Sequence, residues 1–251
     1  MRIKYHKEIE FFLKRFFFSE KLLLKRRLER AIKHNYEPEI KLVKEFVVKG
    51  TDGLDIGVYQ GIYSYEISKY AKTVHAFEFN PIIYPFLNRN IYKIINNIKL
   101  YNFGLSNKNG KTILRIPIRN KLAKEENYEE FFEMGRATIH DKNEFSEFRT
   151  FSVNVKKLDD FRFENPISFI KIDVEGHELE VIEGAIATIN RNKPILLVEI
   201  EERYSKRKVI DTIKFVNALG YKSYYFNEKE LINTATLMNF DSCNNFIFKP
   251  T

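Results

Sequence analysis

Four acidic residues end short apolar runs whose composition is typical of β-strands. They are Asp55, Glu78, Asp173 and Glu199. In a parallel sheet the carboxyl ends of the strands share one edge, and ligands bind in the crevice outside that edge. A carboxylate at such a position can accept hydrogen bonds from hydroxyl groups or take a proton. The spacing therefore predicts one site at which these four carboxylates face the same edge.

The first of these acids opens a glycine-containing turn within LDIGVYQGIYS, residues 54–64. Asp55 ends the strand, Gly57 and Gly61 follow, and a helix is expected from residue 62. Glycine lets the backbone approach a ligand closely. The fingerprint G-x-G-x-x-G of nicotinamide-binding proteins is absent, because Tyr59 stands where its second glycine would be. The motif therefore favours a nucleotide-type turn but disfavours a dehydrogenase.

The second acid, Glu78, ends the run VHAFEF and lies 23 positions after Asp55. An acid at the tip of the second strand can accept both hydroxyls of a nucleoside ribose. A solvated acid, or a capping partner for a helix that starts near Pro81, is the structural alternative. Together with the glycine turn, the spacing favours ribose binding, and Phe79 is expected to belong to the same cofactor site.

The third segment, ISFIKIDVEGHELEVIEGA, places three carboxylates and an imidazole within residues 173–178. Gly176 permits a turn, and Glu178 would favour a helix N-terminus through the helix dipole. Asp173 ends an apolar strand, which makes a purely structural role hard to assign to it. His177 can exchange a proton near neutral pH, although a structural role for it stays open. The candidate catalytic residues are therefore Asp173, His177 and Glu199.

The elements that must position these residues alternate between strand and helix from about residue 50. Such alternation predicts an α/β fold, with a parallel sheet covered by helices on both faces. The dipeptide Asn109-Gly110 suggests a hairpin turn, and a charged segment follows it. Residues 107–150 are therefore interpreted as an insertion near the mouth of the site. The expected strands are 53–56, 73–79, 99–105, 168–173, 195–200, 222–226 and 246–249, and the expected helices are 62–70, 82–95, 178–190 and 206–219.

The first 45 residues are interpreted as an N-terminal helical extension, and residues 46–251 as the main domain. Within residues 1–33, apolar side chains recur every three or four positions, which is typical of amphipathic helices. The apolar face could pack on the domain or on a second copy of the chain in a homodimer. Its phenylalanines and flanking basic residues also permit peripheral contact with an anionic membrane or a glycolipid.

Composition narrows the classes of function. Of the net charge of +8, residues 1–50 carry +7 (14 basic and 7 acidic residues) and the rest only +1, so nucleic acid is not the expected partner. Cys243 is the only cysteine, which excludes an intrachain disulfide and a thiolate zinc site and suggests a reducing, cytoplasmic setting. No glycine-rich phosphate loop with a lysine occurs, and no apolar run is long enough to span a membrane.

The motifs together resemble the FkbM family of methyltransferases. The resemblance covers roughly residues 50–250 and is carried by DIGVYQGIYS, VHAFEFNP, LSNKNG, KKLDDF, IKIDVEGHELEVIEGA and PILLVEI. It implies a Rossmann-like class I methyltransferase fold with a seven-stranded sheet of order 3-2-1-4-5-7-6, the last strand antiparallel. It also implies S-adenosylmethionine as methyl donor. Carried over by position, Asp55, Gly57 and Gly61 form the cofactor turn, Glu78 holds the ribose, and Asp173 lies near the reacting methyl group.

The sequence departs from the family pattern D-x-G-A-N-x-G at Val58 and Tyr59. Because both glycines are kept, the turn is expected to form, and Tyr59 is expected to stack on the cofactor or to narrow the pocket. No metal ligand is assigned.

The resulting hypothesis is an O-methyltransferase that acts on a hydroxyl of a sugar, a glycan or a related small molecule. His177 or Asp173 is the better candidate for general base, and Glu199 is the third. Two alternatives stay open at this point: a non-catalytic module of a glycan-assembly complex, and a methyltransferase that acts on protein or nucleic acid.

Overall fold

The computed structural model describes residues 20–34, 37–119, 132–139, 147–200, 202, 208–237, 239–240 and 243–251. The phenylalanine-rich part of the predicted extension, residues 1–19, lies outside the described residues, as do most of the charged residues between 120 and 146. Among the described residues, no helix is long and apolar enough to cross a membrane.

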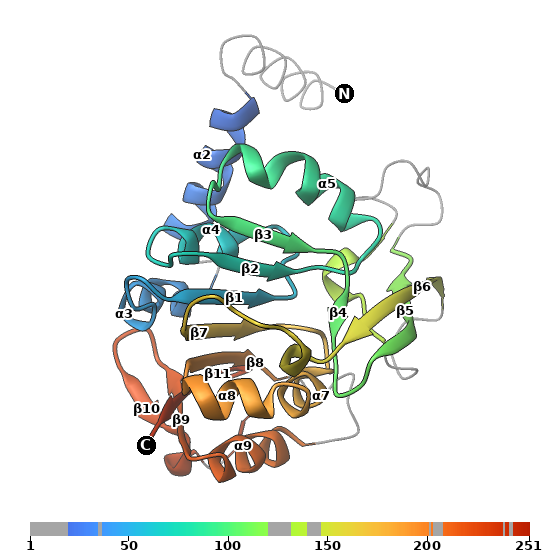
Figure 1. The fold of residues 1–251 in the computed structure, drawn as a ribbon. Coiled ribbons are helices and arrows are strands. Elements are labelled where there is room, and N and C mark those ends of the chain that lie inside the picture. Colours follow the sequence, from blue (N-terminus) through green and yellow to red (C-terminus); the bar gives the residue numbers. More distant parts are fainter. Residues whose placement is uncertain are drawn as a thin grey trace, which may run out of the picture.

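A mostly parallel sheet forms the centre of the protein (Figure 1). Its strands follow the order β10-β9-β11-β8-β7-β1-β2-β3. The central strands β1, β2, β7 and β8 are apolar runs buried on both faces, as expected when helices cover a parallel sheet on both sides. The strands are β1 (Asp52–Ile56), β2 (Val74–Phe77), β3 (Ile98–Tyr101), β7 (Ile167–Ile172), β8 (Ile195–Glu199), β9 (Tyr221–Phe226), β10 (Leu231–Asn233) and β11 (Asn245–Pro250).

The predicted class I methyltransferase fold is confirmed, with an eighth strand added at one edge. Seven strands take the order that the resemblance implied, and β11 runs antiparallel to both β8 and β9. The addition is β10, which forms an antiparallel pair with β9 beyond the expected edge. Sequence patterns missed β10 because a strand of three residues shows too little alternation to be recognised.

Helices cover both faces of this sheet (Figure 1). On one face, α4, α5 and η2 pack with Val74, Ala76 and Phe169 of the strands. On the other face, α7, α8 and α9 pack with Leu54, Ile56 and their neighbours. The bounds of these helices are α4 (Ile62–Ser68), α5 (Ile83–Asn90), η2 (Ile91–Lys93), α7 (Glu178–Glu183), α8 (Ile186–Asn192) and α9 (Val209–Ala218).

The single helix predicted over residues 178–190 is in fact two helices, α7 and α8. Gly184 lies between them, and a Cβ atom there would come within 2.0 Å of the backbone oxygen of Ser106. The helix is thus interrupted where the backbone at Ser106, just after Gly104 and Leu105 of the second sheet, packs against Gly184.

The second sheet has the order β4-β6-β5 and is built largely from the predicted insertion. Its strands are β4 (Gly104–Leu105), β5 (Gly110–Pro117) and β6 (Phe148–Lys156). Asn109-Gly110 does not form the predicted hairpin, because β4 and β5 do not pair with each other and instead lie on opposite sides of β6. The Asn109 side chain accepts a hydrogen bond from Lys157 N and donates one to Asp160.

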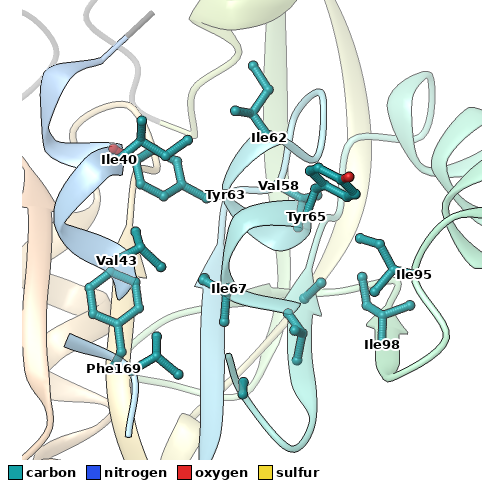
Figure 2. Close-up of a cluster of buried hydrophobic side chains, with 14 of the residues drawn as sticks. Ile40, Val43, Val58, Ile62, Tyr63, Tyr65, Ile67, Ile95, Ile98 and Phe169 are labelled. Atoms are coloured by element: carbon teal, nitrogen blue, oxygen red, sulfur yellow. The ribbon is translucent and has the colours of Figure 1, made fainter. Parts of the chain in front are cut away.

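The described part of the N-terminal extension packs on the domain. It comprises α2 (Glu20–Lys33), η1 (Pro38–Leu42) and α3 (Val43–Phe46). Leu28 of α2 is buried, and Glu29 accepts a hydrogen bond from the Tyr65 hydroxyl of α4. Figure 2 shows Ile40 and Val43 in the same apolar cluster as Tyr63, Ile67 and Phe169. This cluster holds η1 beside α4, which brings the extension to the carboxyl edge of the sheet.

Candidate active site

A pocket with an empty volume of about 1070 Å³, partly open to solvent, lies at the carboxyl ends of β1, β2, β7 and β8. It is lined by residues from these strand ends, from the second sheet and from the N-terminal extension. Six of the lining residues are acidic, and none of the described lining residues is basic. The acids are Glu37, Asp55, Glu78, Asp173, Glu175 and Glu199, and the apolar lining includes Ile40, Ile62, Ile83, Phe79, Leu114 and Met134.

The turn after β1 is fixed by the close approach of two strand ends. Gly57 has φ +89°, and a Cβ atom on it would lie 1.7 Å from the Asp173 carbonyl oxygen. Only glycine can occupy this position. Tyr59 has φ +47°, which is rare for a residue with a bulky side chain, and its ring end faces Gly135 of the second sheet's connection. Gly61 begins α4 with φ +79° and packs against Ile91 without lining the pocket.

Glu78 is held rigidly at the tip of β2. One of its carboxylate oxygens accepts a hydrogen bond from Tyr59 N at 3.0 Å, and the other accepts one from Asn80 N at 2.8 Å. Burial raises the pKa of the Glu78 carboxyl, and these backbone donors partly oppose that effect. Each oxygen keeps a further lone pair for a hydroxyl group in the pocket. The local fold thus orients Glu78 before any ligand binds.

Asp55 is buried at the base of the pocket, where its carboxylate accepts a hydrogen bond from the Ser64 hydroxyl. Burial raises the pKa of Asp55 to about 7, although Ser64 and the nearby Lys171 ammonium favour the charged form. The side chain therefore changes its charge near neutral pH.

This shift predicts how stability depends on pH. Because the folded-state pKa of Asp55 lies above its unfolded value of 3.8, its contribution to stability is present below pH 4 and is lost as the pH rises through 7. The loss is at most about 4 kcal/mol, since one pKa unit corresponds to about 1.4 kcal/mol. We expect the free energy of unfolding from urea titrations to fall less between pH 4 and 8 in Asp55→Asn than in the wild type. Equal slopes would contradict this expectation.

Lys171 lies beneath the pocket, near the carboxyl end of β7, and is surrounded by carboxylates. Its ammonium nitrogen lies 3.7 Å from Glu199, 3.8 Å from Asp173 and 3.8 Å from Glu37. It also donates a hydrogen bond to Asn245 and lies over the Tyr63 ring. Burial alone would lower the pKa of Lys171, but the carboxylates raise it above its ordinary value. One buried cation therefore holds three acids from distant segments together.

The structure brings most of the predicted site residues to one pocket. Asp55, Gly57, Tyr59, Glu78, Phe79, Asp173 and Glu199 all line it. His177 does not: its Nε2 lies 2.9 Å from the Ser106 hydroxyl, its Nδ1 lies 3.4 Å from Glu180, and it lines a separate small cavity beside Gly104 and Val155. The turn at Glu175 and Gly176, both with positive φ, directs the chain away from the pocket before His177.

Sequence reasoning missed Glu37, Lys171 and Asn80. Glu37 is contributed by the extension, and its carboxylate accepts a hydrogen bond from the Tyr63 hydroxyl at 2.7 Å. No local pattern links position 37 to position 173. Lys171 had a usable signal, because a lysine inside the mostly apolar run ISFIKI must find a partner when the strand is buried. Two of its ion-pair partners, Asp173 and Glu199, are among the candidate site residues predicted from the sequence.

Comparison with known proteins identifies the family. Residues 55–223, more than half of the chain, match the family model described as the methyltransferase FkbM domain. The chain belongs to the FkbM methyltransferase family. It is therefore a methyltransferase, and S-adenosylmethionine is the methyl donor of its family. No curated protein matches the sequence.

Solved structures resemble the chain only distantly. An FkbM methyltransferase from Methylobacillus flagellatus KT has 13% identity and a TM-score of 0.47, over 79% of this chain and 43% of that one. An rRNA methylase from Streptococcus thermophilus has 12% identity and a TM-score of 0.47, over 85% of this chain and 95% of that one. A putative methyltransferase from Streptococcus mutans in complex with SAH has 12% identity and a TM-score of 0.45, over 85% of this chain and 95% of that one. The chain spans less than half of the Methylobacillus protein, and none of these likenesses extends to substrate.

The pocket fits the donor of the FkbM family by the chemistry of its lining. Gly57 and Tyr59 form the turn that lines the pocket after β1, Glu78 offers two fixed oxygens to hydroxyl groups, and Phe79 provides an apolar surface. The side-chain nitrogen of Asn80 is buried in this part of the pocket and has no hydrogen-bond partner among the described residues. Such a donor requires an acceptor from a ligand or from water. These residues would hold the nucleoside part of S-adenosylmethionine.

Proposed function

We propose that this FkbM family member is an O-methyltransferase that acts on a hydroxyl of a sugar, a glycan or a related small molecule. The observation that supports the proposal is the width of the pocket, which extends across the ends of four strands. Glu78 directly follows β2 and Glu199 ends β8, and these strands are three positions apart in the order β2-β1-β7-β8. At about 4.8 Å per strand these ends are ~14 Å apart, which leaves room for an acceptor beside a nucleoside.

The charge of the lining supports an acceptor without phosphate groups near the reacting hydroxyl. Six carboxylates line the pocket, and the described lining residues include no Lys, Arg or His. A phosphate backbone is bound by basic side chains and would be repelled by this surface. The acidic pocket thus favours a neutral or cationic acceptor, such as a glycan, and speaks against RNA and DNA as substrates.

The residues at the acceptor end can hold a hydroxyl and receive its proton. When bound, S-adenosylmethionine supplies a methyl group already activated on a sulfonium, and the electron pair of the broken bond stays on its sulfur. Asp173 lies between the donor turn and Glu199, so its carboxylate can orient the acceptor hydroxyl and take the proton as the oxygen is methylated. Glu199 and Glu37 flank it and can accept hydrogen bonds from neighbouring hydroxyls.

Methyl transfer from labelled S-adenosylmethionine to glycans extracted from the source organism tests the proposal. We expect label in the glycan fraction, stable to base as an ether is, and little label with Asp173→Asn. The matched control is Asp160→Asn, which changes an exposed acid that does not line the pocket. Label found only in RNA or protein, or in no fraction from an enzyme that binds the donor, would contradict the proposal.

A further inference from the structure

The side chain of Asn80 is the unusual feature at the donor end of the pocket. Asn80 follows β2 by three residues and is only 2% exposed. Its Oδ1 accepts a hydrogen bond from Ile82 N at 2.9 Å, which fixes which way the amide points. Its Nδ2 has no hydrogen-bond partner among the described residues, yet the residue lines the pocket.

A buried amide donor without a partner is costly in the unliganded protein. Leaving such a donor without a hydrogen bond destabilises the folded protein, because the group has lost its bond to water and gained none in return. Such a group is rare in folded proteins and calls for an acceptor supplied from the pocket. The backbone makes the position rigid, because Asn80 O accepts hydrogen bonds from Ile83 N and Tyr84 N at the start of α5.

Asn80 and Glu78, two residues apart, both line the pocket and carry complementary hydrogen-bonding groups. The Asn80 backbone donates to one Glu78 carboxylate oxygen at 2.8 Å, so the two side chains are fixed relative to each other. A carboxylate only accepts hydrogen bonds, whereas the free amide nitrogen only donates them. A hydroxyl group can satisfy both at once, because it donates its proton and accepts through its lone pairs.

We infer that Asn80 is a cofactor-binding residue whose Nδ2 donates a hydrogen bond to a ribose hydroxyl oxygen of S-adenosylmethionine, while Glu78 accepts from the ribose hydroxyls. The inference rests on the proposed use of this pocket for the donor. The ribose is then recognised by a hydrogen-bond donor, Asn80, together with an acceptor, Glu78, and not by Glu78 alone.

Calorimetry with S-adenosylhomocysteine and its 2′-deoxy and 3′-deoxy analogues tests this assignment. We expect Asn80→Ala to weaken the binding of S-adenosylhomocysteine about ten-fold, which corresponds to the loss of one hydrogen bond. We also expect one deoxy analogue to bind the wild type more weakly than the parent ligand, and this difference to shrink in Asn80→Ala. If the role of Asn80 were purely structural, Asn80→Ala would weaken the binding of all three ligands by the same factor.

A matched variant separates the pocket donor from the local turn. Asn233→Ala removes the same kind of turn bond, since Asn233 Oδ1 accepts from Ala235 N at 2.8 Å, but it lies outside the pocket lining. We expect Asn233→Ala to bind the ligand like the wild type. Equal affinity of Asn80→Ala and wild type, or equal losses for all three ligands, would overturn the inference. Failure of the folded wild type to bind S-adenosylhomocysteine would instead overturn the proposed function.

Discussion

Replacing Lys171 by methionine is expected to destabilise the protein by about 3–5 kcal/mol, the cost of removing one partner from a buried ion pair. The variant keeps the length of the side chain but leaves the carboxylates of Glu37, Asp173 and Glu199 close together without a cation. These oxygens lie within 4.8 Å of one another. Their mutual repulsion can be relieved by protonation, so the loss should be smaller at low pH.

Urea titrations at pH 5 and pH 8 measure this effect, and the chain offers two controls. Lys69→Met removes a lysine that pairs with Glu66 but is partly exposed, and should cost no more than about 1 kcal/mol. Adding Glu199→Gln to Lys171→Met removes one of the repelling charges and should recover part of the loss. A Lys171→Met variant as stable as Lys69→Met at pH 8 would show that the carboxylates do not depend on this cation.

Replacing Gly57 by alanine is expected to destabilise the protein by a comparable amount, about 2–5 kcal/mol. The new methyl group would lie 1.7 Å from the Asp173 carbonyl oxygen, so the ends of β1 and β7 must separate. The left-handed backbone adds about 1–2 kcal/mol for a residue with a Cβ atom, and forced overpacking adds about 1–3 kcal/mol. Donor binding should be lost even where the variant folds, because the turn beside Glu78 is displaced.

Gly50→Ala separates the two contributions to this loss. Gly50 has φ +88°, nearly the same as Gly57, but a Cβ atom there meets nothing within 4 Å. We expect thermal and urea unfolding to show a loss of about 1–2 kcal/mol for Gly50→Ala, from the backbone alone. If both variants lose the same amount, the contact between Gly57 and Asp173 does not constrain the fold.

Gly57 also shows how much of the site could be predicted from the sequence. Gly57 lies in a turn whose strand, glycines and helix are consecutive, so its position at the carboxyl edge of the sheet follows from local pattern alone. The same holds for Glu78 and Asp173, because each ends an apolar strand and parallel strands end at one edge. The fold class and the order of seven strands followed from this alternation and from the resemblance to the FkbM family.

What could not be predicted depends on contacts between distant segments. Glu37 approaches Asp173 only because η1 packs on α4, and no periodicity in either segment encodes that contact. His177 belongs to the same short motif as Asp173, yet the left-handed residues Glu175 and Gly176 separate the two side chains. Asn109-Gly110 has the composition of a hairpin, but β6, almost forty residues later, inserts between the strands that it joins.

Calorimetric titration of S-adenosylhomocysteine into the wild type and into Glu78 variants tests the donor site most directly. We expect the wild type to bind, and Glu78→Ala to bind about 10–100-fold more weakly, which corresponds to the loss of charge-assisted hydrogen bonds. Glu78→Gln keeps an acceptor for the backbone and should show a smaller loss. Glu164→Ala, which removes an exposed acid that does not line the pocket, should bind like the wild type. A folded wild type that binds no ligand at millimolar concentration, or a Glu78→Ala variant with unchanged affinity, would contradict the assignment of this pocket to the methyl donor.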